Sequence, residues 1–263
     1  MKILKPPAGG FSFYLRQMKD NFSRQADVYA KYRPGYPEEL LEFILSKPRQ
    51  KETAWDCATG NGQTAKDLAR HFKKVFATDI SQKQLDNAAK APNIFYSCKP
   101  AEQTSFEDNS FDLITVSQAL HWLKFDRFYT EVKRVAKPGA WLAAWMYSLP
   151  VISPEIDEMI KTGFYKNVMG DYWDYERKYV DDNYTTIPFP FEEIECPAFH
   201  IVLNWTLNDL EGYLRSWSAL QKFISANGYD PLDEFMKQLL PVWGQEPMKI
   251  DFPVSMRMGS IHK

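Results

Sequence analysis

One stretch, residues 53–63, constrains the fold more than any other part of the chain. It reads Thr-Ala-Trp-Asp-Cys-Ala-Thr-Gly-Asn-Gly-Gln. Its apolar start has the character of a buried strand, which Asp56 ends. Gly60 and Gly62 then permit a tight backbone turn, and the residues from Gln63 onward are typical of a helix. Because a helix N-terminus offers free backbone N–H groups, the stretch predicts a nucleotide-binding turn.

Strand-like and helical patterns alternate on both sides of this turn, and the alternation predicts the fold class. Strands are expected at 74–80, 93–98, 111–117 and 141–146, and helices at 37–45, 63–72, 81–89 and 125–136. Such alternation is typical of an α/β protein with a doubly wound, mostly parallel sheet. Segment 250–258 alternates between apolar and other residues, which predicts a last strand that returns antiparallel.

The remaining segments predict how the chain is organised. Residues 1–36 are expected to form an N-terminal arm whose aromatic residues, at helical spacing before Pro34, predict a lid helix; a helix that only packs on the domain is the alternative. Residues 37–263 are expected to form a single domain. Within it, 148–193 combines prolines, paired acids and a Tyr/Trp cluster, which predicts a cap-like insertion after the fifth strand, on the ligand edge.

Composition limits the partners and the compartment. A net charge of −2 gives no electrostatic reason to expect a nucleic acid as partner. No stretch is apolar for long enough to cross a membrane, so no membrane role is expected. The scattered Cys57, Cys98 and Cys196 show neither metal-binding nor disulfide spacing. They predict a protein without a metal in a reducing, cytoplasmic compartment.

The glycine turn fits two kinds of nucleotide. Gly60 to Ala65 satisfies the dinucleotide pattern G-x-G-x-x-G/A, and Asp79 follows Gly62 by 79 − 62 = 17 residues. This keeps an NAD(P)-dependent oxidoreductase as an alternative. However, Asp56 precedes Gly60 by four residues. A carboxylate there can hold a cationic amino group, which nicotinamide cofactors lack and S-adenosylmethionine carries. Asp56 and Asp79, at the ends of the first two strands, therefore favour S-adenosylmethionine.

An ordered set of further motifs resembles the class I S-adenosylmethionine-dependent methyltransferases, type 11 branch. The opening at 32–34 (Tyr-Arg-Pro) and the pair His121-Trp122 resemble the subgroup that includes trans-aconitate-type methyltransferases. The resemblance implies a Rossmann-like, seven-stranded sheet with an antiparallel last strand. The motifs that carry it lie at 27–37, 56–62, 77–81, 101–102, 111–115, 119–122 and 134–139.

The resemblance also implies a cofactor, S-adenosylmethionine, with S-adenosylhomocysteine as the product, and it implies a role for each matching position. The glycine turn would hold the methionine part of the cofactor. The end of the second strand would bind the ribose and the adenine, and the loop after the third strand would contact the edge of the adenine. The end of the fourth strand would face the sulfonium. Ala58 stands where the family usually has glycine, and its methyl group is expected to crowd the turn. The residues concerned are Asp56, Ala58, Gly60 and Gly62, then Asp79 and Ile80, then Ala101 and Glu102, and last Ser117 and Gln118.

The acceptor is expected to be a small molecule. A carboxylate, which would become a methyl ester, is one candidate. A carboxylate is ionised at neutral pH and needs no base, whereas a phenol or an amine can need one. His121 is the candidate base; a structural hydrogen bond is the alternative. A non-catalytic relative that only binds the nucleoside is a third hypothesis. The residues expected to line the acceptor site are Tyr32, Arg33, Trp122, Tyr147, Tyr172 and Trp173.

Overall fold

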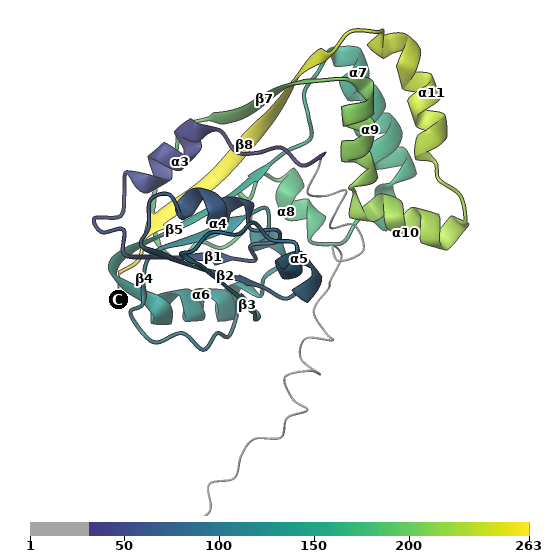
Figure 1. Ribbon diagram of the computed structural model, residues 1–263. Coiled ribbons are helices and arrows are strands. Elements are labelled where there is room, and N and C mark those ends of the chain that lie inside the picture. Colours follow the sequence, from purple (N-terminus) through teal and green to yellow (C-terminus); the bar gives the residue numbers. More distant parts are fainter. Residues whose placement is uncertain (1–31, 263) are drawn as a thin grey trace, which may run out of the picture.

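The computed structural model describes residues 32–262, coloured in Figure 1. The lid helix expected within 1–36 therefore falls almost entirely outside the described residues. Strands and helices alternate through the first half of the described chain, as the sequence predicts. The helices there are α3 (Glu38–Leu45), α4 (Gln63–Leu68), α5 (Gln82–Asp86), the short 3-10 helix η2 (Leu120–Trp122) and α6 (Phe125–Val135).

A single sheet runs through the molecule in the order β3-β2-β1-β4-β5-β8-β6, and β7 also pairs with β8. The strands β1 to β5 pair in parallel, and β8 pairs antiparallel with β5. The doubly wound sheet and the antiparallel last strand are thus confirmed. The strands are β1 (Thr53–Cys57), β2 (Lys74–Asp79), β3 (Ile94–Cys98), β4 (Phe111–Ser117), β5 (Ala136–Tyr147), β6 (Glu192–Ile194), β7 (Phe199–Trp205) and β8 (Met248–Ser260).

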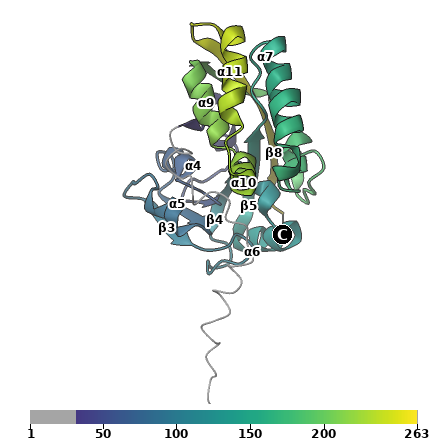
Figure 2. The same cartoon turned by 90° about the vertical axis from the view of Figure 1, so that its right-hand side faces the viewer.

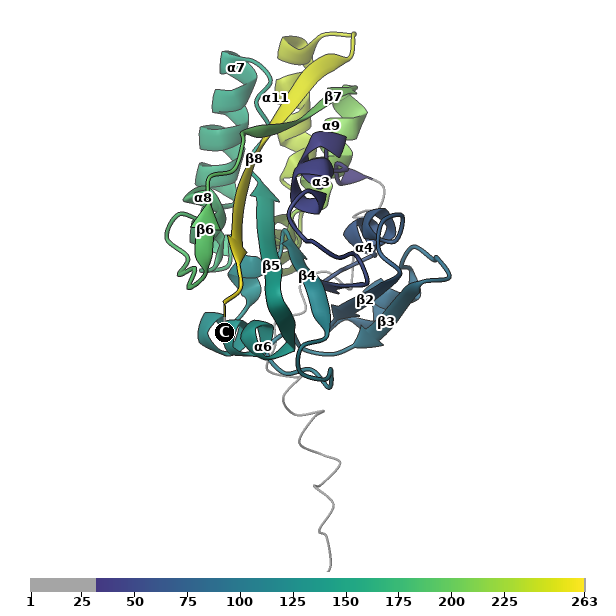
Figure 3. The ribbon, with the colours of Figure 1, turned by 90° about the vertical axis from the view of Figure 1, so that its left-hand side faces the viewer.

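The sheet has eight strands where seven are expected, because two short strands share one position. Both β6 and β7 pair antiparallel with the long strand β8 (Figure 3). Pro197 lies between them, and proline has no N–H with which to continue a ladder. The sixth strand of the expected sheet is therefore present but interrupted.

Apolar residues cover both faces of the sheet, as a doubly wound fold requires. Along β5 the side chains alternate between two cores: Trp145 belongs to the core that includes residues of α3 and α4, and Met146 to the core that includes residues of α6. Phe128 and Val132 of α6 are fully buried against that second core. This alternation follows from the two-residue period of a strand and places helices on opposite faces (Figure 1).

A helical lobe stands at the end of the sheet where β7 and β8 extend (Figure 2). It joins the start of the 148–193 segment to the helices that follow β7. Phe164 stacks on Phe235 with ring centroids 4.6 Å apart, and Trp173 packs against Trp217. The segment thus shares its core with residues 207–243. The lobe comprises α7 (Pro154–Glu158), the π-helix η3 (Met159–Val168), η4 (Gly170–Tyr172), α9 (Leu207–Arg215), α10 (Ser218–Asn227) and α11 (Leu232–Trp243). The helix α8 (Arg177–Asp181) lies apart from the lobe, near η2, and its Val180 belongs to the core that includes α6 (Figure 1).

Asp112 ties the starts of two central strands together. Its carboxylate accepts hydrogen bonds from the backbone N–H of Thr53 at 2.9 Å and of Glu52 at 3.1 Å, and it pairs with Lys137 at 2.9 Å. Asp112→Ala would leave these donors without an acceptor, so we expect a loss of about 2 kcal/mol in the free energy of unfolding. Urea unfolding measures this loss.

The exposed Asp108 serves as the control, because its ion pair with Arg134 lies at the surface. Asp108→Ala is expected to cost less than about 1 kcal/mol. Equal losses in the two variants would contradict the role given to Asp112.

Candidate functional site

Two adjoining cavities lie at the carboxyl ends of the parallel strands, where the strand order reverses between β1 and β4. This crevice is the usual ligand site of an open α/β sheet. The larger, which we call the main cavity, has a volume of about 420 Å³. The smaller, which we call the side cavity, has a volume of about 50 Å³. Both cavities are bordered by Gln118, His121 and Trp122, so they share part of their walls.

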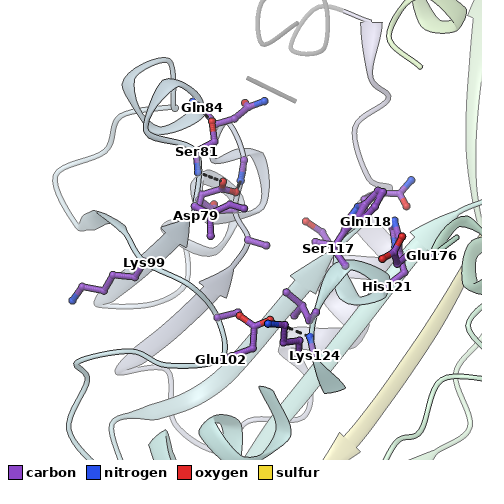
Figure 4. Close-up of a pocket in the computed structure, with 18 of the residues that line it drawn as sticks. Asp79, Ser81, Gln84, Lys99, Glu102, Ser117, Gln118, His121, Lys124 and Glu176 are labelled. Carbon is purple, nitrogen blue, oxygen red and sulfur yellow. Dashed lines mark hydrogen bonds between the residues drawn. The ribbon is translucent and has the colours of Figure 1, made fainter. Parts of the chain in front are cut away.

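Asp79 holds the glycine turn in place. One oxygen of its carboxylate, Oδ2, accepts the backbone N–H of Gly60 at 2.8 Å, and the other, Oδ1, accepts that of Ser81 at 2.8 Å. Asp79 also borders the main cavity, on the side opposite Ser117 and Gln118 (Figure 4). The carboxylate therefore fixes the turn and the start of α5 together, at the edge of the space available to a ligand.

Asp56 lies behind the turn and does not border either cavity. It is fully buried, and it accepts hydrogen bonds from the hydroxyls of Thr59 and Thr115. Burial raises the pKa of Asp56 to about 6, against the lowering effect of these hydroxyls. In this geometry the Asp56 carboxylate is hydrogen-bonded within the protein. To contact the amino group of a ligand, it would have to give up its bonds to Thr59 and Thr115.

Ala58 borders the main cavity with φ of 53°, in the left-handed region. An L-residue other than glycine costs about 1–2 kcal/mol there. Alanine in place of the usual glycine therefore strains the backbone, in addition to the crowding expected from the alanine methyl group. Gly62 also has a positive φ, of 77°, but it faces the ring of Tyr96 and lies outside the cavity walls.

The structure brings most of the expected cofactor residues together around the main cavity. His121 and Trp122 join them there, and Glu176 borders the cavity from the segment before α8. Figure 4 shows how the labelled side chains surround the space. The expected residues that border the main cavity are Ala58, Gly60, Asp79, Ile80, Ala101, Glu102, Ser117 and Gln118.

Glu102 contains an acceptor atom that the fold leaves unused. Its Oε1 accepts the backbone N–H of Lys124 at 3.0 Å, drawn as a dashed line in Figure 4. Its Oε2 is buried and has no hydrogen-bond partner among residues 32–262. Buried polar atoms are nearly always satisfied. An N–H group of a ligand, such as the amino group of an adenine, would supply the missing donor.

The expected acceptor residues are distributed differently. Arg33, Trp122 and Trp173 border the side cavity. Tyr147 lies outside it, with its hydroxyl accepting a hydrogen bond of 2.9 Å from Nη1 of Arg33. Tyr172 lies outside both cavities, where its hydroxyl accepts a hydrogen bond from Asn227.

Tyr32 also lies outside both linings; its ring packs over Gly212 so closely that a Cβ there would meet it at 2.5 Å. Three of the six expected acceptor residues thus meet around one space. Tyr147 is connected to that space through its hydrogen bond with Arg33.

The side cavity also contains residues that the sequence analysis does not single out. Arg177 borders it, and Tyr184 contacts His121 from outside its lining. Both residues lie far from His121 in the sequence and match no motif. The aromatic run around Arg177, from Trp173 to Tyr179, is the one local signal that could have directed attention to this arginine.

Comparison with known proteins decides between the nucleotide-binding alternatives. Residues 55–144 match a family model described as a methyltransferase domain. A provisionally named methyltransferase of Dictyostelium discoideum is 35% identical over 245 residues, which cover 90% of this chain and 93% of that protein. The chain belongs to the class I S-adenosylmethionine-dependent methyltransferases. This assignment favours methyl transfer over the nicotinamide alternative.

A solved structure supports the fold of this methyltransferase over nearly its whole length. It is a provisionally named type II methyltransferase from Anaeromyxobacter dehalogenans, with a TM-score of 0.80 and 35% identity, covering 88% of this chain and 99% of that one. A malonyl-[acyl-carrier protein] O-methyltransferase from Marinomonas is 30% identical over 149 residues, 53% of this chain and 54% of that protein. The narrower resemblance to trans-aconitate-type enzymes stays a prediction.

The described part of the methyltransferase contains neither a candidate metal site nor a candidate membrane-spanning helix. Residues 32–262 contain no group of three or more His, Cys, Asp or Glu side chains that could hold a metal ion. None of the helices in that range has the length and apolar character needed to cross a membrane.

Proposed function

We propose that this methyltransferase transfers the methyl group of S-adenosylmethionine to a carboxylate oxygen of a small molecule and so forms a methyl ester. The observation that carries the proposal is the side cavity. Two arginines, Arg33 and Arg177, border it, and it adjoins the main cavity at His121. Guanidinium groups bind carboxylates through paired hydrogen bonds, so this space suits an anionic acceptor.

The main cavity fits the cofactor. Asp79 would hold the ribose hydroxyls, and the unused acceptor of Glu102 would take the adenine amino group. The Gly60 turn would approach the methionine part closely. Gln118 borders both cavities and Ser117 precedes it, so the sulfonium end would lie beside the acceptor. When bound, S-adenosylmethionine supplies an electrophilic methyl group and a good leaving group.

The Arg177 guanidinium is hydrogen-bonded by the described residues at one edge and not at the other. Its Nε donates hydrogen bonds to the hydroxyl of Tyr165 at 2.7 Å and to Asp181 at 3.3 Å, and its guanidinium lies over the ring of Trp173 at 4.8 Å. Its two terminal nitrogens make no hydrogen bond to residues 32–262. Tyr165 belongs to the π-helix η3, a rare geometry that often occurs at functional sites. The guanidinium is thus oriented by its surroundings while its donors remain available.

The chemistry asks little of the protein beyond alignment. A carboxylate is already ionised at neutral pH, so no proton has to be removed. Holding the acceptor oxygen in line with the methyl group, away from water, supplies much of the rate enhancement. Trp122, Trp173 and Trp217 wall the side cavity with apolar surface that would exclude water. The O-methyltransferase name of the Marinomonas relative supports an oxygen as the methyl acceptor.

Arg177→Gln tests the proposal. Removing a charged donor pair is expected to cost about 1.5–2 kcal/mol of acceptor binding, or a ~10- to 30-fold rise in the acceptor KM. The affinity for S-adenosylhomocysteine should change less than about twofold, because Arg177 does not border the main cavity. The measurement combines steady-state kinetics on a panel of carboxylic acids, phenols and amines with calorimetric titration of S-adenosylhomocysteine.

Arg70→Gln is the matched control, since Arg70 lies at the surface and, among residues 32–262, pairs only with Asp67. It should leave the acceptor KM unchanged. Arg177→Lys should recover part of the loss, because lysine keeps the charge and lacks the planar fork. Methylation of phenols or amines in preference to every carboxylic acid on the panel would contradict the proposal, as would an unchanged acceptor KM in Arg177→Gln.

A further inference from the structure

His121 stands at the junction of the two cavities, with its ring in contact with one phenol. Its Nδ1 lies 2.7 Å from the hydroxyl oxygen of Tyr184, within the fold. The other ring nitrogen, Nε2, makes no hydrogen bond to residues 32–262 and is not sealed from the cavities. One nitrogen is therefore engaged by the protein, and the other is available to a bound molecule.

The direction of the Tyr184–His121 hydrogen bond follows from what else surrounds the phenol oxygen. Tyr184 is fully buried, and Nδ1 of His121 is the one hydrogen-bond partner of its hydroxyl among residues 32–262. A phenol has a single proton to donate, and buried polar groups are nearly always satisfied. If Nδ1 carried a proton, the phenol proton would be buried without an acceptor. The phenol therefore donates its proton to Nδ1 of His121.

Both groups are neutral. Burial raises the pKa of the Tyr184 phenol, which keeps its proton. Burial, together with the nearby Arg177 cation, lowers the pKa of His121 to about 3. A neutral imidazole carries one N–H, and with Nδ1 accepting from Tyr184 that N–H is at Nε2.

The backbone shows that this arrangement is maintained against a cost. Tyr184 has φ of 62°, and Asn183 before it has φ of 54°, both in the left-handed region. Gln118, on the other side of His121, has φ of 53°. Such residues cost about 1–2 kcal/mol each and gather at sites where geometry serves function.

We infer that His121 donates an Nε2–H hydrogen bond to the oxygen of the acceptor, that Tyr184 is the positioning residue that fixes this tautomer, and that His121 is not the base of the reaction. The inference rests on the proposed function for the identity of the acceptor. It also gives a physical reason why the site would select a carboxylate over a phenol or an amine. A site that offers a fixed donor and two guanidiniums, with no acceptor for a proton at His121, favours an oxygen that is ionised before it binds.

The tautomer can be measured without any acceptor. The full chain, labelled with 15N-histidine, gives long-range 1H–15N correlations that distinguish Nε2–H, Nδ1–H and doubly protonated rings. The chain has 4 histidines, and the signals that disappear in His121→Gln belong to His121. We expect the Nε2–H pattern at pH 7, and a mixture of tautomers in Tyr184→Phe. An Nδ1–H or doubly protonated ring in the wild type would overturn the inference.

Two amide variants then separate a donor from a base. The side-chain NH₂ of Gln at position 121 reaches the place of Nε2, whereas the shorter Asn reaches the place of Nδ1, and neither amide can remove a proton. His121→Gln is expected to retain kcat/KM for a carboxylic acid within ~5-fold. His121→Asn is expected to lose ~30-fold or more, because the donor is missing where the acceptor oxygen binds.

Equal, large losses in two well-folded variants would contradict the donor role, as would full activity in both. The two hypotheses fail separately. If the wild-type ring is Nε2–H but the panel shows no carboxylate methylation, the proposed acceptor is wrong while the tautomer assignment holds. Thermal unfolding of each variant shows that the comparison is made on folded protein.

Discussion

Asp79→Ala is expected to weaken S-adenosylhomocysteine binding by about 100-fold or more, the largest effect on binding that the site predicts. The Asp79 carboxylate accepts two backbone N–H groups, from Gly60 and Ser81, each at 2.8 Å. It also borders the cavity where the ribose would lie. Each hydrogen bond to a charged group is worth about 1.5–3 kcal/mol. The loss of the ribose contact and the loosening of the turn together therefore cost more than about 3 kcal/mol of binding free energy, which corresponds to a more than 100-fold loss of affinity.

Calorimetric titration of the wild type and the variant measures this effect directly. Asp86→Ala is the control, because Asp86 ends α5 and lies outside the cavity walls, and within the described part of the chain its side chain bonds only to Gln82 of the same helix. It should bind S-adenosylhomocysteine as tightly as the wild type. Asp79→Asn should lie between the two, since the amide keeps one acceptor oxygen. Unchanged affinity in Asp79→Ala would remove the main cavity as the cofactor site.

The central sheet could be predicted from sequence because its signals are local. Buried strands such as β4 are short runs of mainly apolar residues, and helices such as α6 repeat their apolar residues at helical spacing. The split of the outer strand into β6 and β7 could not be predicted in the same way, since both segments pair with the distant β8. The helical lobe is also non-local, because Phe164 and Phe235 meet only after the chain has returned through β7.

The same distinction separates the two cavities. The main cavity follows from the rule that parallel strands end at one edge, so Gly60, Asp79 and Ser117 could be placed around it from their positions in the sequence. The rule does not say which way a side chain points. Asp56 lies one residue before the end of its strand, which continues through Cys57, and its carboxylate turns inward to Thr59 and Thr115.

The side cavity is assembled from four distant parts of the chain, with Arg33, His121, Arg177 and Trp217 each contributed by a different one. No spacing rule connects them. The role of His121 shows the consequence. From sequence it is a candidate base by residue type, whereas Tyr184, remote in the chain and strained in its backbone, occupies the nitrogen that decides the tautomer.

Gly62→Ala is expected to be the most destabilising of the single substitutions considered, at about 3 kcal/mol in the free energy of unfolding. Two costs add. Gly62 has φ of 77°, where an alanine costs about 1–2 kcal/mol. A Cβ there would also lie 2.1 Å from the hydroxyl oxygen of Tyr96 and 3.0 Å from its Cζ. The ring cannot move away freely, because its hydroxyl donates a hydrogen bond to the carbonyl of Ala89. Overpacking of this kind costs about 1–3 kcal/mol.

Gly60→Ala separates the two costs. Gly60 also has a positive φ, of 56°, but a Cβ there would meet nothing within 4 Å. We expect urea unfolding to show a loss of about 1 kcal/mol for Gly60→Ala. Adding Tyr96→Phe to Gly62→Ala removes the closest atom and should return part of the stability, measured against Tyr96→Phe alone as a double-mutant cycle. Equal losses at the two glycines, or a cycle with no coupling, would show that the Tyr96 contact does not explain why the second position of this turn is glycine.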